Sequence, residues 1–224
     1  MTMATNMRDL GGYAASDGRI TQFGRLFRSD CPSSFSEEDV AWIRRLGIRT
    51  AIDLRSIGEC EVMPSAYASL SGIAYHPCPF AGGAEAPARE EDIPGSYLAL
   101  CSDRQNMRRV FSCIASAEGG VVFHCQAGKD RTGVVAALLL TLAGVGVADV
   151  LADYQISNTH LRAFLQEQRA RHREMPSWVG RSESWYMERM LDALLSEYHG
   201  IGGYFDRLGL DAEQQRCLQL RLLG

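Results

Sequence analysis

The first half of the chain alternates between helical and strand-like spacing of its hydrophobic residues. After Ser36, a residue typical of helix N-caps, an acidic turn and then apolar side chains at helical spacing continue to Leu46, which predicts a short amphipathic helix. Ile48 to Leu54 is a short run rich in β-branched residues between Gly47 and Arg55, and Val121 to Phe123 is a short apolar run after Gly120. They predict buried strands, and Ile73 to Cys78 predicts a weaker one.

Helical spacing dominates the rest of the chain, and the final third, Ala148 to Gly224, has almost no strand signal. A helix is predicted for Tyr97 to Ala117, and the most hydrophobic helix for Thr132 to Ala143, directly after the strand and a polar loop. The glycines from Gly200 to Gly203 follow a predicted helix and predict a linker. Further helices are predicted for residues 148–158, 159–174, 184–198 and 211–223.

This order of elements predicts an α/β fold with a central, mostly parallel sheet flanked by helices and a helical C-terminal elaboration. The length of 224 residues fits one domain, with an α/β core over residues 1–147 and a helical part over residues 148–224. In such sheets, chemistry gathers beyond the carboxyl ends of the strands. Two strand ends carry polar residues there, Asp53 to Arg55 and His124 to Cys125.

Composition narrows the classes of function. The chain is 46% apolar and 22% charged, as in ordinary folded proteins, and its net charge of −4 argues against a nucleic-acid partner. No apolar run reaches membrane-spanning length and the first ten residues lack a signal-peptide core, so we expect no transmembrane segment, a cytoplasmic location and a monomer. The seven cysteines include no Cys-x-x-Cys pair, which predicts reduced thiols and no metal site.

The loop of residues 124–133 carries the candidate chemistry. Cys125 and Arg131 lie six positions apart between a predicted strand and a predicted helix. A loop of this length can turn its backbone N–H groups inward, and the helix N-terminus adds positive potential, so the loop predicts a phosphate site. Gly128 eases the turn, and Arg131 can grip two phosphate oxygens with its planar fork. The predicted phosphate-binding residues are Gln126, Ala127, Gly128, Lys129, Asp130 and Arg131.

The same positive field acts on the thiol of Cys125. A cysteine that faces a helix N-terminus, Arg131 and Lys129 is expected to ionise well below the free-thiol pKa of about 8.5. A thiolate under an anion-binding loop is suited to in-line attack on a phosphoryl group, which would give a phosphocysteine that water then hydrolyses. No metal or organic cofactor is needed for this chemistry.

The motif Cys-x5-Arg-Thr-Gly preceded by His resembles the signature of the cysteine-dependent tyrosine phosphatases. In its fuller form, residues 124–133 resemble an atypical bacterial branch whose members act on phosphotyrosine and often on phosphoinositides. Similarity to that branch extends over nearly the whole chain. It includes residues 6–13, 24–29, 52–56 with Glu59, 153–154, 157–158 and the tail 204–223.

The resemblance implies a tyrosine-phosphatase-like fold and a role for each residue that matches the motif. Cys125 would be the nucleophile and Arg131 the phosphate clamp. Thr132 would hydrogen-bond the thiolate and help it leave the phosphocysteine, and His124 would shape the loop by bonding its backbone. The Trp-Pro-Asp loop that usually supplies the general acid in this superfamily is absent from the sequence.

Three aspartates therefore compete for the role of proton donor. Asp130 lies inside the loop, at the position that the atypical branch usually implicates, and we rank it first. Asp53 sits at a neighbouring strand end, where it could instead orient Arg131. Asp92, in the stretch from Ala84 to Gly95 that we expect to be flexible, precedes the nucleophile by 33 residues, a separation seen for the mobile acid of dual-specificity relatives.

The single lysine of the chain gives the clue to the substrate. Of the 23 lysine and arginine residues, only Lys129 is a lysine, and it lies inside the loop. Lysine at this position occurs in phosphatases of inositol phospholipids. We therefore predict a protein-tyrosine phosphatase with phosphoinositides as a further substrate class. The alternatives are a lipid phosphatase, a non-catalytic phosphate-binding module and a rhodanese-type sulfurtransferase.

Overall fold

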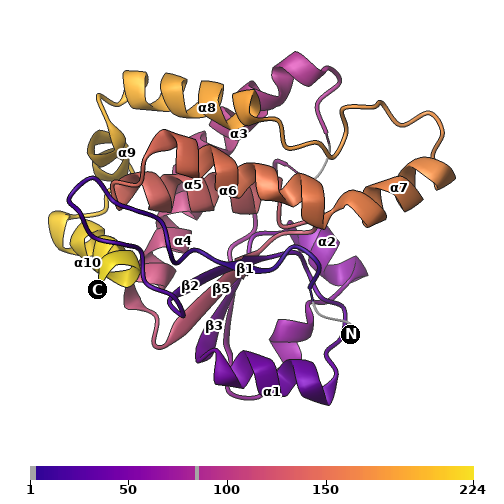
Figure 1. The fold of residues 1–224 in the computed structure, drawn as a ribbon, viewed down its shortest axis with the longest axis horizontal. Coiled ribbons are helices and arrows are strands. Elements are labelled where there is room, and N and C mark those ends of the chain that lie inside the picture. Colours follow the sequence, from indigo (N-terminus) through magenta and orange to yellow (C-terminus); the bar gives the residue numbers. More distant parts are fainter. Residues whose placement is uncertain (1–3, 84–85) are drawn as a thin grey trace.

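The structure, a computed structural model, describes residues 4–83 and 86–224, and a five-stranded sheet runs through its centre (Figure 1). The strand order is β1-β2-β5-β3-β4. Only the pairing of β1 with β2 is antiparallel, which confirms the prediction of a mostly parallel sheet. The strands are β1 (Arg8–Asp9), β2 (Leu26–Ser29), β3 (Ile48–Asp53), β4 (Ala74–Pro77) and β5 (Gly120–His124).

The register of the three central strands brings their carboxyl ends to one level. Ser29 at the end of β2 and Asp53 at the end of β3 are both paired with His124 at the end of β5. Because β5 lies between the other two strands, the loop that follows it emerges from the middle of the sheet edge. This places Cys125 at the point where the chemistry of parallel sheets is normally found.

Ten α-helices and two short 3₁₀ helices surround the sheet in the described part of the chain. Before β5 they are α1 (Glu37–Arg45), α2 (Ile57–Val62), η1 (Ala66–Ser69), η2 (Glu90–Asp92), α3 (Ile93–Ser102) and α4 (Arg104–Ser116). After it come α5 (Asp130–Leu142), α6 (Val147–His160), α7 (Arg162–Arg171), α8 (Ser184–Glu197), α9 (Ile201–Arg207) and α10 (Ala212–Leu223).

The two faces of the sheet are covered unequally. Helix α1 lies on one face, where Ile43 packs with Phe27 and Val122 in a small hydrophobic cluster. The opposite face carries the helices that follow β5 together with α3 and α4, and α5 runs through the middle of this layer (Figure 1). Eleven of the 13 residues of α5 are buried, so its apolar sequence is explained by contacts on all sides.

Two sequence predictions in this layer were wrong. The stretch from Tyr97 to Ala117 is not one helix, because α3 ends at Ser102 and Asp103 caps a new helix by accepting a hydrogen bond from the backbone N–H of Asn106. The glycine stretch from Gly200 does not form a linker, since helix α9 starts at Ile201. Within the described residues, no helix is long and apolar enough to cross a membrane.

Candidate active site

The loop between β5 and α5 is fixed from behind through its carbonyl oxygens. The carbonyl of Gln126 accepts from the backbone N–H of Cys31 at 3.1 Å, and that of Ala127 from Nδ2 of Asn6 at 2.9 Å. The carbonyl of Gly128 accepts from Nη2 of Arg28 at 2.9 Å. In a trans peptide the following N–H points the opposite way, so the N–H groups of residues 127–129 point toward the inside of the loop. This orientation of the N–H groups is the one that the predicted phosphate site requires.

Gly128 is required at its position for two reasons. Its φ of +66° lies in the left-handed region, which residues with a side chain rarely adopt. A Cβ atom at this position would also lie 2.5 Å from the backbone of Ser29. The loop can therefore approach β2 closely only because residue 128 has no side chain.

A buried group of charges supports the back of the loop. Asp153 of α6 is fully buried and forms ion pairs with Arg8, at 2.8 Å, and with Arg28. Burial alone would raise the pKa of Asp153, but these two arginines outweigh it and hold the pKa below its ordinary value. Arg28 in turn donates to the loop carbonyls, so Arg8, Arg28 and Asp153 of α6 together position the loop.

Arg131 is positioned by a carboxylate that the sequence analysis did not assign to the site. Its two terminal nitrogens donate to the two oxygens of Glu59 on α2, at 2.6 and 2.7 Å. Burial alone would raise the pKa of Glu59, but the bonds from Arg131 and Ser56 outweigh it and lower the pKa to about 2. Glu59 is also part of the capping box of α2 with Ser56, and the spacing of these two residues is the signal that the sequence offered.

Asp53 does not orient Arg131, which corrects that expectation. Its carboxylate accepts from Arg55 at 2.7 Å and from the hydroxyl of Tyr75 at 2.6 Å. These bonds outweigh the effect of burial and lower the pKa of Asp53 to about 2. Asp53 is fully buried and holds the end of β3, so it has no route to a substrate.

His124 is buried beneath the loop, as expected for a residue that shapes it. One ring nitrogen lies 3.1 Å from the hydroxyl of Ser65, and the other lies 3.3 Å from the carbonyl of Cys125. Burial is the main reason why the pKa of His124 is lowered, although nearby Asp53 opposes this effect. A neutral ring at neutral pH follows, held by one bond on each side.

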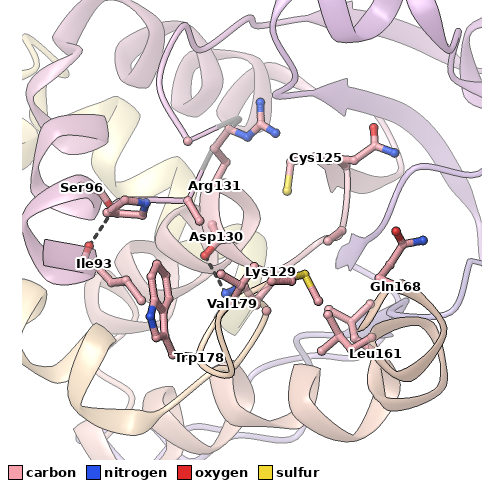
Figure 2. Close-up of a pocket in the computed structure, with 18 of the residues that line it drawn as sticks. Ile93, Ser96, Cys125, Lys129, Asp130, Arg131, Leu161, Gln168, Trp178 and Val179 are labelled. Atoms are coloured by element: carbon pink, nitrogen blue, oxygen red, sulfur yellow. Dashed lines mark hydrogen bonds and ion pairs between the residues drawn. The ribbon is translucent and has the colours of Figure 1, made fainter. Parts of the chain in front are cut away.

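Cys125 lies on the floor of a pocket of about 300 Å³. Its side chain is buried, and its sulfur faces the cavity between Arg131 and the residues of the opposite wall (Figure 2). All the predicted phosphate-binding residues except Gly128 line this pocket. Thr132, like Asp53, differs from its expected role. Its hydroxyl is buried without a hydrogen-bond partner in the described chain, so the expected bond to the sulfur of Cys125 is not formed.

Asp130 and Lys129 lie side by side at the start of α5, on the pocket side (Figure 2). The ammonium of Lys129 is 2.9 Å from Oδ1 of Asp130 and donates to the carbonyl of Arg181 at 2.8 Å. Oδ1 also accepts from the hydroxyl of Tyr97 at 2.5 Å. The aspartate that the sequence ranked first is thus the one that faces the cavity.

Asp92 does not reach the pocket. Its carboxylate forms an exposed pair with Arg89, at 2.8 and 2.9 Å, and Asp92 is not among the residues that line the cavity. The stretch proposed to carry a mobile acid is in part helical, because η2 and α3 begin at Glu90 and Ile93. Ala84, where that stretch begins, lies outside the described residues.

An apolar wall completes the pocket on the side opposite the loop. It comes from Leu161, from α7 and from the segment after α7, and Figure 2 labels Leu161, Gln168, Trp178 and Val179 among its members. We call these residues the pocket wall: Leu161, Phe164, Leu165, Gln168, Met175, Trp178, Val179 and Gly180. Within residues 4–83 and 86–224, no group of three or more His, Cys, Asp or Glu side chains could hold a metal ion.

Comparison with known proteins agrees with this geometry. The sequence model of the tyrosine phosphatase family matches residues 1–224. The chain belongs to the tyrosine phosphatase family. Its fold is accordingly a tyrosine-phosphatase-like α/β fold, as predicted from the motif and its surroundings.

Three bacterial relatives illustrate the family. A tyrosine-protein phosphatase of Nostoc commune is 31% identical over 91% of this chain and 73% of its own length. The triple specificity protein phosphatase PtpB of Mycobacterium tuberculosis is 29% identical over 73% of this chain and 71% of its own length. The Cupriavidus necator protein H16_A0669, named as a candidate tyrosine-protein phosphatase, is 35% identical over 75% of this chain. This chain spans 65% of the length of that last relative.

Proposed function

We propose that this protein hydrolyses phosphate monoesters of tyrosine through Cys125, with Arg131 as the phosphate clamp and Asp130 as the proton donor. The observation that carries the proposal is the arrangement of the loop. Its carbonyls are fixed outward, so its N–H groups face the cavity above a cysteine sulfur. Donors held in this way stabilise negative charge that develops on phosphoryl oxygens, without reorganisation during the reaction.

The mechanism has two steps at the same phosphorus atom. The thiolate of Cys125 attacks phosphorus in line with the ester oxygen, forming the S–P bond as the P–O bond breaks. Asp130 gives its proton to the leaving phenolate oxygen. Water then attacks phosphorus, the S–P bond breaks, and Asp130 takes a proton from that water. Inorganic phosphate is released and the thiolate is restored.

In this mechanism Arg131 keeps the two hydrogen bonds to Glu59 that it forms in the structure. In the structure Glu59 occupies both terminal nitrogens of Arg131 on one edge of the guanidinium. The Nε–H of Arg131 is buried and has no partner in the described residues. This N–H and the second N–H of each terminal nitrogen remain available to phosphate oxygens, and Glu59 holds the guanidinium in position.

The test is turnover of p-nitrophenyl phosphate by the wild type and by Cys125→Ser. We expect loss of activity by about three orders of magnitude or more, because removing the nucleophile removes the covalent path. A matched control is Cys217→Ser, which replaces a cysteine of α10 that does not line the pocket. If Cys125→Ser and the wild type release phosphate at the same rate, the proposed mechanism is wrong.

A second substrate class is proposed because of Lys129. This residue lines the pocket, is 6% exposed and contributes a charge beside the loop in a cavity with an apolar wall. Charge interactions are stronger in such surroundings than in water, so additional phosphate groups on an inositol ring would be favoured there. The name of the mycobacterial relative, a triple specificity phosphatase, fits a site that accepts more than one substrate class.

Lys129→Ala distinguishes the two substrate classes. We expect turnover of a phosphoinositide to fall about tenfold more than turnover of a phosphotyrosine peptide, since one missing charge contact at a partly desolvated site is worth about 1–2 kcal/mol. Equal losses on both substrates would contradict a role of Lys129 in lipid recognition. They would leave the tyrosine phosphatase proposal intact.

A further inference from the structure

Tyr97 extends from α3 to the proposed proton donor. Its ring is buried, with 2% of the residue exposed, and its hydroxyl lies 2.5 Å from Oδ1 of Asp130. The same hydroxyl lies 2.7 Å from the hydroxyl of Tyr154 on α6. The hydroxyls of Tyr154 and Tyr97 therefore form a short chain of polar groups that leads from α6 to Asp130 at the edge of the pocket.

The two oxygens of Asp130 have different surroundings. Oδ1 receives the hydroxyl of Tyr97 and lies 2.9 Å from the ammonium of Lys129. In the described chain, no side chain or backbone group is hydrogen-bonded to Oδ2. Since Asp130 lines the pocket, Oδ2 is the oxygen available to a substrate.

Tyr97 acts as a donor in this contact. Burial is the largest reason why the pKa of Tyr97 is raised well above its ordinary value, and the nearby carboxylate of Asp130 adds to it. The pKa of Tyr154 is raised in the same direction, also chiefly by burial. Tyr97 therefore keeps its proton, and Tyr154 can donate to it in turn.

We propose that Tyr97 is a positioning residue that fixes Asp130 through Oδ1, so that the proton passes to the leaving group from Oδ2. This inference rests on the function proposed above. The hydroxyl of Tyr97 can donate to Oδ1 whether Oδ2 carries a proton or not, so the contact is kept in both steps. In the first step the proton moves from Oδ2 to the ester oxygen as the P–O bond breaks. In the second, Oδ2 takes a proton from the attacking water as the S–P bond breaks.

The prediction concerns leaving groups. A nitrophenolate leaves readily without a proton, whereas phenolate is a much stronger base and depends on the donor. We expect Tyr97→Phe to lower kcat about tenfold on phenyl phosphate and less than about twofold on p-nitrophenyl phosphate, as for a donor whose orientation is loosened. Asp130→Asn is expected to show the same dependence with a larger loss. In the Asp130→Asn background, Tyr97→Phe should have no further effect.

Tyr204→Phe is the matched control. It also removes one hydroxyl from a buried tyrosine, which here donates to the carbonyl of Cys101 at 3.0 Å, and Tyr204 does not line the pocket. We expect equal kcat changes on both esters for this variant. If Tyr97→Phe likewise lowers kcat equally on both esters while retaining a wild-type melting temperature, Tyr97 does not position the donor.

The same measurements separate the two proposals. If the wild type depends on Cys125 but Tyr97→Phe shows no leaving-group dependence, the function stands and the positioning role is wrong. If Tyr97→Phe still lowers kcat tenfold on phenyl phosphate in the Asp130→Asn background, the tyrosine acts on something other than Asp130. If the wild type has no Cys125-dependent turnover, both proposals are overturned.

Discussion

The floor and the wall of the pocket are built in opposite ways. The floor, residues 124–133, has its carbonyls bonded from behind by Asn6, Arg28 and Cys31, and its glycine is packed against β2. The wall comes mainly from α7, which has no buried residue, and from the segment after it. Phe164 of the wall is 47% exposed, whereas Cys125 of the floor is 3% exposed.

The difference assigns separate tasks to the two regions. The floor must hold donors in place within a fraction of an ångström, because charge stabilisation depends on their aim. The wall contributes apolar contact area, which tolerates small displacements, and it is held by fewer polar contacts, such as those from Arg169 to the carbonyls of Ser177 and Val179. Substitutions in the floor should therefore change kcat, and substitutions in the wall should change KM.

The largest effect is expected for Arg131→Lys in the floor. Lysine cannot form the two parallel bonds to Glu59 or present a planar fork to phosphate. We expect kcat on p-nitrophenyl phosphate to fall at least about a hundredfold, the usual loss for one donor aimed at developing charge. Steady-state kinetics measure it. A loss confined to KM would show that Arg131 only binds substrate.

Gly128→Ala tests whether the shape of the floor is as constrained as its contacts indicate. The positive φ costs about 1–2 kcal/mol for alanine, and the new Cβ would lie 2.5 Å from Ser29. We expect kcat to fall about tenfold or more and the melting temperature to fall by about 4–8 °C, from a loss of about 2 kcal/mol. Gly146→Ala, at a position with no atom within 4 Å of the added Cβ, is the control. Equal melting temperatures for the two variants would contradict the constraint.

The carboxylates that support the floor should make the free energy of unfolding depend on pH in acid. Glu59 and Asp53 both have folded-state pKa values of about 2, below their ordinary values of 4.5 and 3.8. Unfolded chains therefore bind more protons between these values, so the free energy of unfolding should rise with pH from about 2 to about 5 and then level off. Urea unfolding at several pH values measures this slope. Glu59→Gln should flatten it, and an unchanged slope would show that the pair with Arg131 contributes nothing to stability.

The smallest effect is expected for Phe164→Ala in the wall. A half-exposed aromatic ring contributes about 1 kcal/mol of contact, so KM for an aromatic substrate should rise about threefold to tenfold with little change in kcat. The melting temperature should stay within about 2 °C, as for most surface substitutions. A kcat loss as large as that of Gly128→Ala would remove the distinction between floor and wall.

The sequence predicted the floor better than the rest of the site because the floor is local. Cys125 and Arg131 belong to one loop between one strand and one helix, so spacing along the chain determines their relation. The residues that hold this loop are distant in the sequence, as with Glu59 and Arg131 or Arg28 and Gly128. The spacing of hydrophobic and polar residues along the chain does not reveal such distant pairs. Position at the sheet edge left open whether Asp53 orients Arg131, and the structure shows that Arg55 takes its carboxylate instead.

Among secondary elements, the same distinction between local and distant causes applies. Strands β3 and β5 are buried at all positions except Arg49, and their β-branched and apolar residues predicted them from the sequence. Strands β1 and β2 have only two and four residues. They form because Arg8 and Asp9 of β1 pair with Arg28 and Phe27 of β2, which are distant in the sequence. The break between α3 and α4 depends on one capping aspartate, Asp103, within a long run of good helix formers.

The buried carboxylate of Asp153 has a consequence for synthesis of the chain. It pairs with Arg8 and Arg28, which support the reactive loop, and it follows that loop by more than 20 residues. A nascent chain that ends before α6 already contains Cys125, but it lacks the carboxylate of Asp153 that pairs with the two arginines. The support that these two arginines give to the loop is therefore completed only after α6 has been synthesised.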